Sequence, residues 1–582
     1  MRKLGTIDQE QYQAAVTAPV TASHHGAKLA FDAPYAAEMA RREMIRRYGL
    51  AAYSDGYHVI TTISGKLQRS ANQAVLDGLT TYDNRHGYRG PDQSLPALPG
   101  MDMTESWRSA LAETSVIAGR IPALVSAVSE DGVELLLKDG SYRFMPWENG
   151  LRQARPYITE NALGPKPATP ADLLAPGDLI RVEQRRDNSL FLTQIPAAQA
   201  ALVSLSPQDG AILSVVGGLG FQQSKFNRAI QAARQPGSNF KPFIYGAALE
   251  HGFTAASIIN DAPVVFEDAT LEDTWRPEND GGKFYGPTRL RWALTKSRNL
   301  VSIRLLQELG IQRAIDYASR FGFDPKKLAA DLSLALGTQA ITPMQLVTAY
   351  AAIANGGYRI HHYLIATIED FHREQIFQAN PDTVCRDCEA DGSPPAEDPD
   401  RELSMEEILS QAERLPQAKR IMDARVAFIL DSILKDVITK GTGRRARVLK
   451  RSDIAGKTGT TNGPTDAWFS GYNEDVVTSA WLGFDQNLLL GKREFGGSAA
   501  LPIWIDFMRV ALEDSPERAR EIPEGIVNVR IDPKTGLLGK PGRPDAIFEY
   551  FRSELVPSAS AEARHASNIR GNVGEGLQEQ LF

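Results

Sequence analysis

Three short groups of polar residues could together activate a serine for nucleophilic attack. The first group is Ser238-Asn239-Phe240-Lys241, and the Pro236-Gly237 pair before it marks the start of a predicted helix. Because residues three positions apart share one face of a helix, the Ser238 hydroxyl and the Lys241 amine can meet. A serine hydroxyl needs a base to take its proton, and a lysine is that base only if its pKa falls. Alone, the spacing is a weak signal, since a capping serine followed by a surface lysine is common.

The second group, Ser297-Arg298-Asn299, follows the segment from Trp292 to Lys296. A hydroxyl and an amide two residues apart can converge on one site from a turn. Asn299 could hold a substrate carbonyl, and Ser297 could pass a proton to a leaving amine. The alternative is an ordinary polar turn.

The third group is Lys457-Thr458-Gly459-Thr460-Thr461, which alternation around Ile454 places on a strand. Gly459 would let a substrate backbone approach closely. Lys457 would add a second cation that lowers the pKa of Lys241 and attracts a carboxylate. A phosphate-binding loop would need glycine where Arg451 stands and a helix after the motif, whereas the segment after it is strand-like.

The order of the three groups carries more weight than any one of them. Chance copies occur, but none lies in a matching context: Ser432-Ile433-Leu434-Lys435, Ser70-Ala71-Asn72 and Lys534-Thr535-Gly536. The chosen groups occur in the order S-x-x-K, S-x-N and K-T-G, with helices after the first and strands around the last. This set resembles the signature of the penicillin-binding proteins and serine β-lactamases.

The elements that must position these groups belong to one large segment, residues 199–545. It opens with a predicted hairpin (202–205 and 212–216), continues with helices to Ile353, and returns to strands near 454–461, 467–472 and 476–484. Two strands, then helices, then three strands predict an α+β domain, an antiparallel sheet flanked by helices.

A second segment, residues 91–198, has a different pattern. Short strands at 123–128, 133–137, 142–145 and 179–182 are separated by turns that contain Asp-Gly. This pattern predicts a small β-barrel or sandwich, which either binds an oligomer or spaces other domains.

The flanking segments are less regular. We expect a helix over 36–48, a strand over 57–63, and a helix over 66–79 that Ser64 caps, so that residues 56–90 form a linker. The acidic, Pro-rich stretch 379–416 predicts a mobile loop, and residues 546–582 predict a disordered tail.

Composition excludes several classes of protein. The chain has 582 residues, a formal net charge of -7 and mixed signs, which argues against a nucleic-acid partner. No apolar run reaches the roughly 18 residues that span a bilayer, and the N-terminus lacks a signal peptide. Cys385 and Cys388 predict a small disulfide or two free thiols, because zinc would need two more ligands. We expect no metal or organic cofactor.

Longer stretches resemble the class A, bifunctional penicillin-binding proteins of Gram-negative bacteria, of the 1a type. The likeness covers nearly all of residues 1–540, and the residues that carry it are 201–203, 217–218, 225–229, 234–243, 283–287, 354–358 and 440–443. Residues 85–91 resemble the family's lead-in to an inserted oligonucleotide-fold-like domain. The resemblance therefore implies that the small β-domain is of this type.

The resemblance also implies a reaction, a D,D-transpeptidation that cross-links peptidoglycan. Ser238 would attack the bond between two terminal D-alanines of a stem peptide, with Lys241 as its base and the Ser238 and Thr460 backbone N–H groups as the oxyanion hole. Ser297 and Lys457 would relay a proton, and Asn299 would orient the acyl chain. Thr458, Gly459 and Thr460 would bind the substrate. β-Lactams would acylate Ser238.

The family's partners and location follow as expectations. We expect peptidoglycan stem peptides as substrates, cell-wall regulatory proteins as possible partners of the β-domain, and the periplasmic face of the inner membrane as the location. The family's membrane anchor is an N-terminal helix, and we expect it to be missing from this chain.

One departure concerns the family's glycosyltransferase. Residues 1–55 resemble the late part of that domain, but no Glu-Asp pair stands in the motif E-D-x-x-F-x-x-H; Glu267-Asp268 is one that fails. We expect a truncated chain in which these residues do not polymerise glycan. Three alternatives stay open for the serine site: a D,D-carboxypeptidase, a serine β-lactamase and a non-catalytic cell-wall scaffold.

Overall fold

The computed structural model describes residues 1–18, 29–95, 104–263, 276–386, 416–539, 542 and 544–557. It separates into two compact units, Met1–Asp32 and Ala33–Phe582. The first unit holds a short 3₁₀ turn, Arg2–Leu4, and helix α1 (Gln9–Thr17). Asp8 begins α1 because its carboxylate accepts the Gln11 backbone N–H at 2.7 Å.

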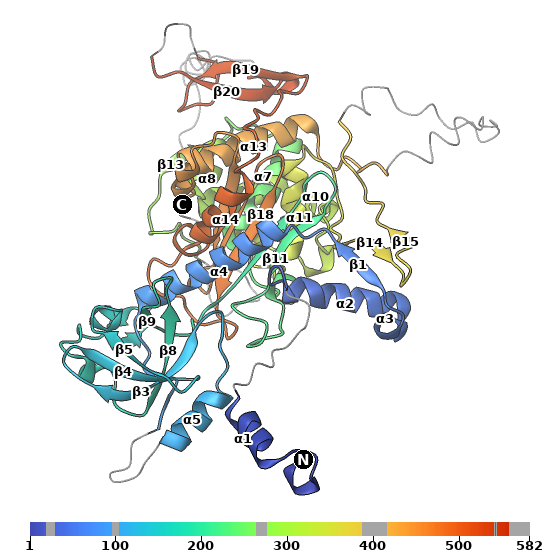
Figure 1. The fold of residues 1–582 in the computed structure, drawn as a ribbon. Coiled ribbons are helices and arrows are strands. Elements are labelled where there is room, and N and C mark those ends of the chain that lie inside the picture. The colour runs from blue at the N-terminus through green and yellow to red at the C-terminus, as the bar shows by residue number, and fades with distance from the viewer. Residues whose placement is uncertain are drawn as a thin grey trace, which may run out of the picture. The chain divides into compact units, whose positions relative to one another are not determined.

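The second unit is built on an antiparallel sheet that includes β11 and β18 (Figure 1). Its five strands have the order β11-β10-β18-β17-β16. The strands are β10 (Gln199–Leu205), β11 (Ile212–Val216), β16 (Ala455–Thr460), β17 (Asp466–Tyr472) and β18 (Val477–Gly483). The structure thus confirms the predicted hairpin and the three returning strands. Strand β16 is the last strand on its side of the sheet.

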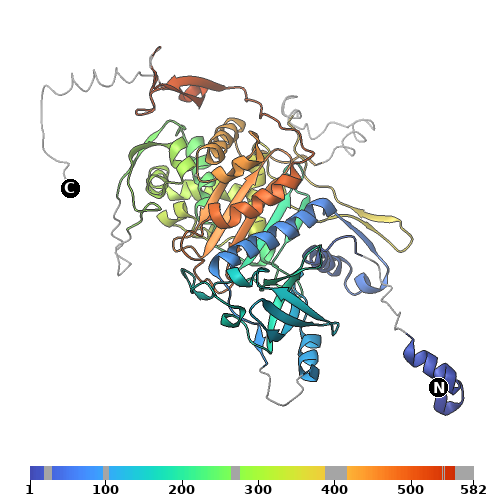
Figure 2. The same cartoon turned by 60° about the vertical axis from the view of Figure 1, so that its left-hand side comes forward.

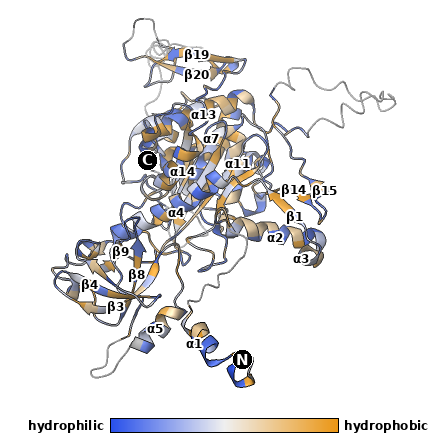
Figure 3. Cartoon of the chain, in the orientation of Figure 1, coloured by the Kyte–Doolittle hydropathy of each residue, from blue (hydrophilic) through white to orange (hydrophobic). Residues whose placement is uncertain are grey.

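Helices cover one face of this sheet. Ala201, Val203 and Leu205 of β10 point into a core shared with these helices, as the alternation of strand side chains requires. The helices are α7 (Lys241–Glu250), α8 (Leu290–Lys296), α9 (Asn299–Leu309), α10 (Ile311–Arg320), α11 (Pro343–Ala354) and α13 (Ala424–Thr439). Colouring by hydropathy marks α7 and α11 as largely apolar (Figure 3).

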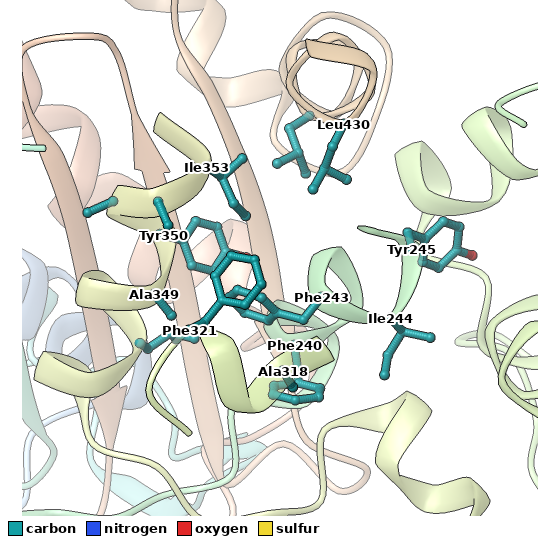
Figure 4. Packing of buried hydrophobic residues seen from close by; sticks show 14 of the residues in the cluster. Phe240, Phe243, Ile244, Tyr245, Ala318, Phe321, Ala349, Tyr350, Ile353 and Leu430 are labelled. Atoms are coloured by element: carbon teal, nitrogen blue, oxygen red, sulfur yellow. The ribbon is translucent and has the colours of Figure 1, made fainter. Parts of the chain in front are cut away.

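Aromatic rings fill the centre of that core. Phe243 of α7 meets Phe321, Phe323 and Tyr350 edge-on, with ring centroids 5.1 to 5.7 Å apart (Figure 4). Edge-to-face pairs of this kind add about 0.5–1.5 kcal/mol each beyond the area they bury. The helix that begins beside the first motif is therefore held firmly at its centre.

Two helices cover the other face. Ala200 and Leu202 of β10 belong to a second core with α4 (Gly65–His86) and α14 (Leu501–Ala511). Figure 2 shows blue α4 and orange-red α14 running side by side across the sheet. Ser64 caps α4 as predicted, but the helix extends to His86 rather than 79 because the Tyr82 hydroxyl donates to the Leu490 carbonyl at 2.9 Å.

The small β-domain forms a six-stranded sheet. Hydrogen bonds give the order β2-β8-β3-β4-β5, with β9 paired to β8. The strands are β2 (Gln93–Ser94), β3 (Ile121–Val128), β4 (Gly132–Leu137), β5 (Tyr142–Pro146), β8 (Asp178–Gln184) and β9 (Leu190–Thr193). Alongside lie α5 (Thr104–Glu113) and the pair β6 (Tyr157–Thr159) and β7 (Ala162–Leu163). Its core includes Val125, Leu135 and Ile180.

The segment before α4 belongs to the second unit. Helix α2 (Pro34–Tyr48) buries Ala36 and Ala40 in the core of the large sheet, and α3 (Ala51–Ser54) follows it. Strand β1 (His58–Thr61) pairs with β14 (Ile365–Glu369), which pairs with β15 (Gln375–Gln378). Helices α2 and α4 thus pack against the large sheet, and Tyr88 is the first residue that joins the core of the small β-domain.

The predicted boundary of the C-terminal tail is wrong. Strand β20 (Ile547–Arg552) pairs with β19 (Ile526–Ile531), so residues 547–552 are not part of a tail. The hairpin is held through Glu549, whose buried carboxylate accepts from Arg291 of α8 at 2.6 Å. Residues 558–582 and most of the predicted loop 379–416 lie outside the described residues.

The described residues include neither a membrane-spanning helix nor a cluster of metal ligands. No helix among them is both long and apolar enough to cross a bilayer. No group of three or more His, Cys, Asp or Glu side chains within the described ranges could hold a metal ion. Cys385 is disulfide-bonded, while Cys388 lies outside those ranges.

Candidate active site

The first motif lies where a 3₁₀ turn, Gly237–Phe240, runs directly into α7. Ser238 is half-buried on this turn, and Lys241 is fully buried as the first residue of α7. Gly237 has a φ of 55°, and a Cβ there would lie 2.4 Å from the Thr460 carbonyl oxygen. The serine turn is therefore pressed against the strand that carries the third motif.

Ser297 has a strained backbone. It ends α8 in the left-handed region, with φ 59° and ψ 42°, which non-glycine residues rarely adopt. Two backbone bonds hold the turn, Ser297 N–H to the Leu294 carbonyl at 3.1 Å and Arg298 N–H to the Ala293 carbonyl at 2.9 Å. Such strain is concentrated at functional sites in proteins.

Two lysines converge on this turn. Lys457 Nζ donates to Ser297 Oγ at 2.9 Å, and Lys241 Nζ donates to the Ser297 carbonyl oxygen at 2.9 Å. Lys241 Nζ also donates to Asn299 Oδ1 at 2.7 Å and lies 3.5 Å from Ser297 Oγ. The structure thus brings together the lysines of the first and third motifs with both polar residues of the second. The predicted Ser238–Lys241 hydrogen bond is not among those of the described residues.

Burial lowers the pKa of both lysines. Loss of hydration lowers the pKa of Lys241 well below its ordinary value, and the neighbouring Lys457 and Arg298 cations lower it further. Burial alone lowers the pKa of Lys457 to about 7. An amine in this state can accept a proton near neutral pH, which general-base chemistry requires.

The third motif lies on β16, at the edge of the sheet. Lys457 pairs with Ser470, Gly459 with Trp468 and Thr460 with Ala467 of β17. The free edge of an outer strand can hold an extended peptide by main-chain hydrogen bonds. The strand that follows also excludes the phosphate-binding loop, which would need a helix there.

The two threonines of β16 have neighbours that fix them. Thr458 Oγ1 and Thr442 Oγ1 are 2.6 Å apart, and Thr460 Oγ1 accepts the Gly496 N–H at 3.0 Å. A Cβ at Gly459 would lie 2.3 Å from the Pro236 carbonyl oxygen. Gly459 therefore gives room to the serine turn, in addition to any substrate.

Several supporting residues were not predicted from the sequence. Tyr350 of α11 donates its hydroxyl proton to the oxygens of Asn239, and Asn239 Nδ2 donates to Ser470 Oγ at 3.1 Å. Asn279 and Asp261 lie behind Asn299. No spacing rule connects these positions with the motifs, because the fold alone brings them together. Thr442 stands within a stretch that supported the family resemblance.

The chance copies of the motifs do not form sites. Ser432 lies within α13 and donates its hydroxyl to the Ile429 carbonyl at 2.7 Å. Its partner in the pattern, Lys435, pairs with Asp431 at 2.9 Å. Lys435 is thus engaged by a carboxylate of its own helix and makes no hydrogen bond to Ser432 among the described residues.

Two known domain families match segments of this chain. The penicillin-binding protein transpeptidase domain matches residues 200–508, and the penicillin-binding protein OB-like domain matches residues 88–198. These two matches define the class, a penicillin-binding serine D,D-transpeptidase with an OB-like domain.

Comparison with individual proteins identifies the family within this class. Penicillin-binding protein 1A of Pseudomonas aeruginosa is 50% identical over 579 residues, which are 97% of this chain and 70% of that protein. Its counterpart in Escherichia coli is 37% identical, over 99% of this chain and 73% of that protein. The chain belongs to the penicillin-binding protein 1A family.

Solved structures of penicillin-binding proteins have a similar fold. The crystal structure of penicillin-binding protein 1A from Haemophilus influenzae has a TM-score of 0.83 and 36% identity, and the likeness covers 96% of this chain and 81% of that one. The penicillin-binding protein PonA1 from Mycobacterium tuberculosis, at 18% identity and a TM-score of 0.53, shares the fold.

Proposed function

We propose that Ser238 is the nucleophile with which this D,D-transpeptidase forms its acyl-enzyme. The observation that carries the proposal is the convergence of two buried, weakly basic lysines on Ser297, beside the turn that holds Ser238. One of these lysines follows the serine by three residues, at the point where the 3₁₀ turn runs into α7.

The proposed first step forms an ester and releases D-alanine. Neutral Lys241 takes the Ser238 proton, and Oγ attacks the carbonyl carbon between the two terminal D-alanines of a stem peptide. The backbone N–H groups of Ser238 and Thr460 stabilise the oxyanion, a type of contribution that often dominates catalysis. Ser297, bonded to Lys457, passes a proton to the departing amine. Acyl transfer to an amine of a second stem peptide then restores the serine.

Substrate binding is assigned to the remaining motif residues. Asn299 orients the acyl chain, and Gly459 lets its backbone lie along β16. The hydroxyls of Thr458 and Thr460 hold the terminal carboxylate. Lys457 is fully buried, so it supports this carboxylate from behind the threonines by its charge. No step needs a metal or an organic cofactor.

The domain assignment follows from the same family. We propose that residues 1–55 are the end of a glycosyltransferase domain and that residues 91–198 are the OB-like domain. The transpeptidase domain then comprises residues 199–545, the strand β20 that completes its last hairpin, and β1 and α4, which precede the OB-like domain. The likeness to penicillin-binding protein 1A supports a location on the periplasmic face of the inner membrane.

The OB-like domain is a candidate docking site for cell-wall regulatory proteins. It exposes large apolar side chains on two of its strands, and such side chains often contribute to partner binding. Phe144 of β5 is 53% exposed and Ile158 of β6 is 59% exposed. Nucleic acid is not expected as a partner, because the chain has a net charge of -7.

A matched pair of serine variants tests the nucleophile. Ser238→Ala should abolish covalent labelling by a fluorescent penicillin, whereas Ser432→Ala, which alters the chance S-x-x-K copy, should label like the unaltered protein. Thermal unfolding checks that both variants are folded. A folded Ser238→Ala protein that still labels would contradict the assignment.

A further inference from the structure

The side chain of Asn279 lies directly behind the second motif. It is 4% exposed and has four hydrogen-bonded neighbours. Its Oδ1 accepts the backbone N–H groups of Asn299 at 2.8 Å and Leu300 at 3.4 Å. Its Nδ2 donates to Asp261 Oδ1 at 2.7 Å and to the Lys283 carbonyl at 2.9 Å.

These bonds supply a helix cap that the local sequence lacks. Helix α9 begins at Asn299, and its N-cap residue, Arg298, makes no capping hydrogen bond, since a guanidinium has no acceptor. The first N–H groups of a helix need acceptors from outside the helix. Asn279, 20 residues earlier in the chain, provides the acceptor oxygen for two of them.

The cap also fixes the amide that contacts Lys241. Asn299 Oδ1 accepts from Lys241 Nζ at 2.7 Å, and Asn299 Nδ2 donates to the Glu278 carbonyl at 2.8 Å. Residues 278 and 279 therefore hold both the backbone and the side chain of Asn299. The two donor bonds of Asn279 fix its own amide, so that its oxygen faces α9.

Asp261 completes the support. It ends strand β12 (Ile258–Asp261), which pairs with β13 (Gly286–Arg289), and its side chain is fully buried. Its Oδ2 has no hydrogen-bond partner within the described ranges and lies 3.9 Å from Arg298 Nε. The guanidinium of Arg298 is stacked on the Tyr285 ring, 3.4 Å from the centroid. A buried carboxylate is retained here because it anchors the Asn279 amide and faces a cation.

We propose that Asn279, anchored by Asp261, is a positioning residue for the reaction: it holds Asn299 where the Asn299 oxygen can hold the Lys241 amine in place. The proposal rests on the proposed roles of Ser238 and Lys241. Asn279 itself contacts neither of them and acts through α9.

Charged groups from several elements face Lys241. Lys457 of β16 and Arg298 before α9 favour its neutral form, while the carboxylates of Asp261 and Asp280 favour its charged form. A change at residue 279 that adds a carboxylate beside Asp261 therefore tests both position and charge.

Two variants at residue 279 separate the effect of position from the effect of charge. Asn279→Ala removes the cap, and we expect acylation by a fluorescent penicillin to slow on the order of 10- to 100-fold, as small displacements of catalytic groups do. Asn279→Asp keeps an acceptor oxygen for α9 but sets two carboxylates side by side. A proton shared by that pair restores a donor, so the ratio of the Asn279→Asp variant's rate to the unaltered rate should rise as the pH falls.

A control variant in the OB-like domain shows whether any change in rate is specific to residue 279. Asn149→Ala, which removes a similar amide bond to the Leu190 carbonyl in the OB-like domain, should leave the rate unchanged. Unaltered rates in a folded Asn279→Ala protein would overturn the proposal. If that variant does not fold, a pH-independent rate ratio for Asn279→Asp would overturn it. Ser238→Ala is labelled in parallel, so that a failure of the nucleophile assignment is seen separately.

Discussion

At the scale of single residues, the chemistry depends on two lysine amines that donate hydrogen bonds to uncharged oxygen atoms. Lys241 donates to Ser297 and Asn299, and Lys457 donates to Ser297 and the Thr458 carbonyl. Burying a charged amine costs much free energy, so burial favours the neutral amine and lowers its pKa. The pair is thereby prepared to move protons, at a cost in stability that only a functional role explains.

A lysine variant tests the coupling between these amines. Lys457→Met removes the cation that helps to lower the pKa of Lys241, so that pKa should rise. The neutral amine is the base, so as the pH is lowered the variant should lose acylation at a higher pH than the unaltered protein does. The maximal acylation rate, reached at high pH, should also fall. The midpoint of the acylation rate against pH measures the effect.

The control for this variant comes from the chance motif. Lys435→Met alters the ion-paired lysine of α13 and should leave the midpoint where it is. A Lys457→Met midpoint equal to the unaltered one would show that the two lysines are not coupled.

At the scale of elements, the site depends on a close approach between the serine turn and β16. Gly237, Gly337 and Gly459 meet there, and a Cβ at Gly337 would lie 2.1 Å from the Gly237 carbonyl oxygen. Trp468 of β17 adds a bond from its indole N–H to the Gln235 carbonyl at 2.9 Å. The oxyanion donors proposed for Ser238 and Thr460 require this contact.

A glycine pair tests the close approach. Gly237→Ala would place a Cβ 2.4 Å from the Thr460 carbonyl oxygen, so the turn and the strand must separate. We expect acylation to slow by about 100-fold, as expected for a misplaced catalytic group. Gly220→Ala, where a Cβ would meet nothing nearer than 3.8 Å, should acylate normally. Equal rates in the two variants would contradict this role of the contact.

The elements also show what the sequence could predict. The strands near 202–216 and 454–484 were found because their apolar residues alternate and turn residues bound them. The end of α4 and the strand β20 were missed, since each is held by a distant partner, Leu490 for Tyr82 and Arg291 for Glu549. The motif residues followed from spacing, whereas Asn279 has no such signal.

At the scale of the whole molecule, the transpeptidase unit is discontinuous in sequence. Helix α4 and strand β1 precede the OB-like domain, yet α4 packs against the central sheet and β1 pairs with β14. The matched transpeptidase segment begins only at residue 200. The OB-like domain is thus inserted between α4 and β10, and α4, which lies within the segment predicted as a linker, packs into the second core of the sheet.

The role of Ser238 is tested most directly by the mass of the intact protein after treatment with benzylpenicillin. We predict one adduct with the full mass of the penicillin, carried by the peptide that contains Ser238, that persists after free penicillin is removed. An adduct on another residue, or a rapid return to the unmodified mass with release of hydrolysed penicillin, would contradict it.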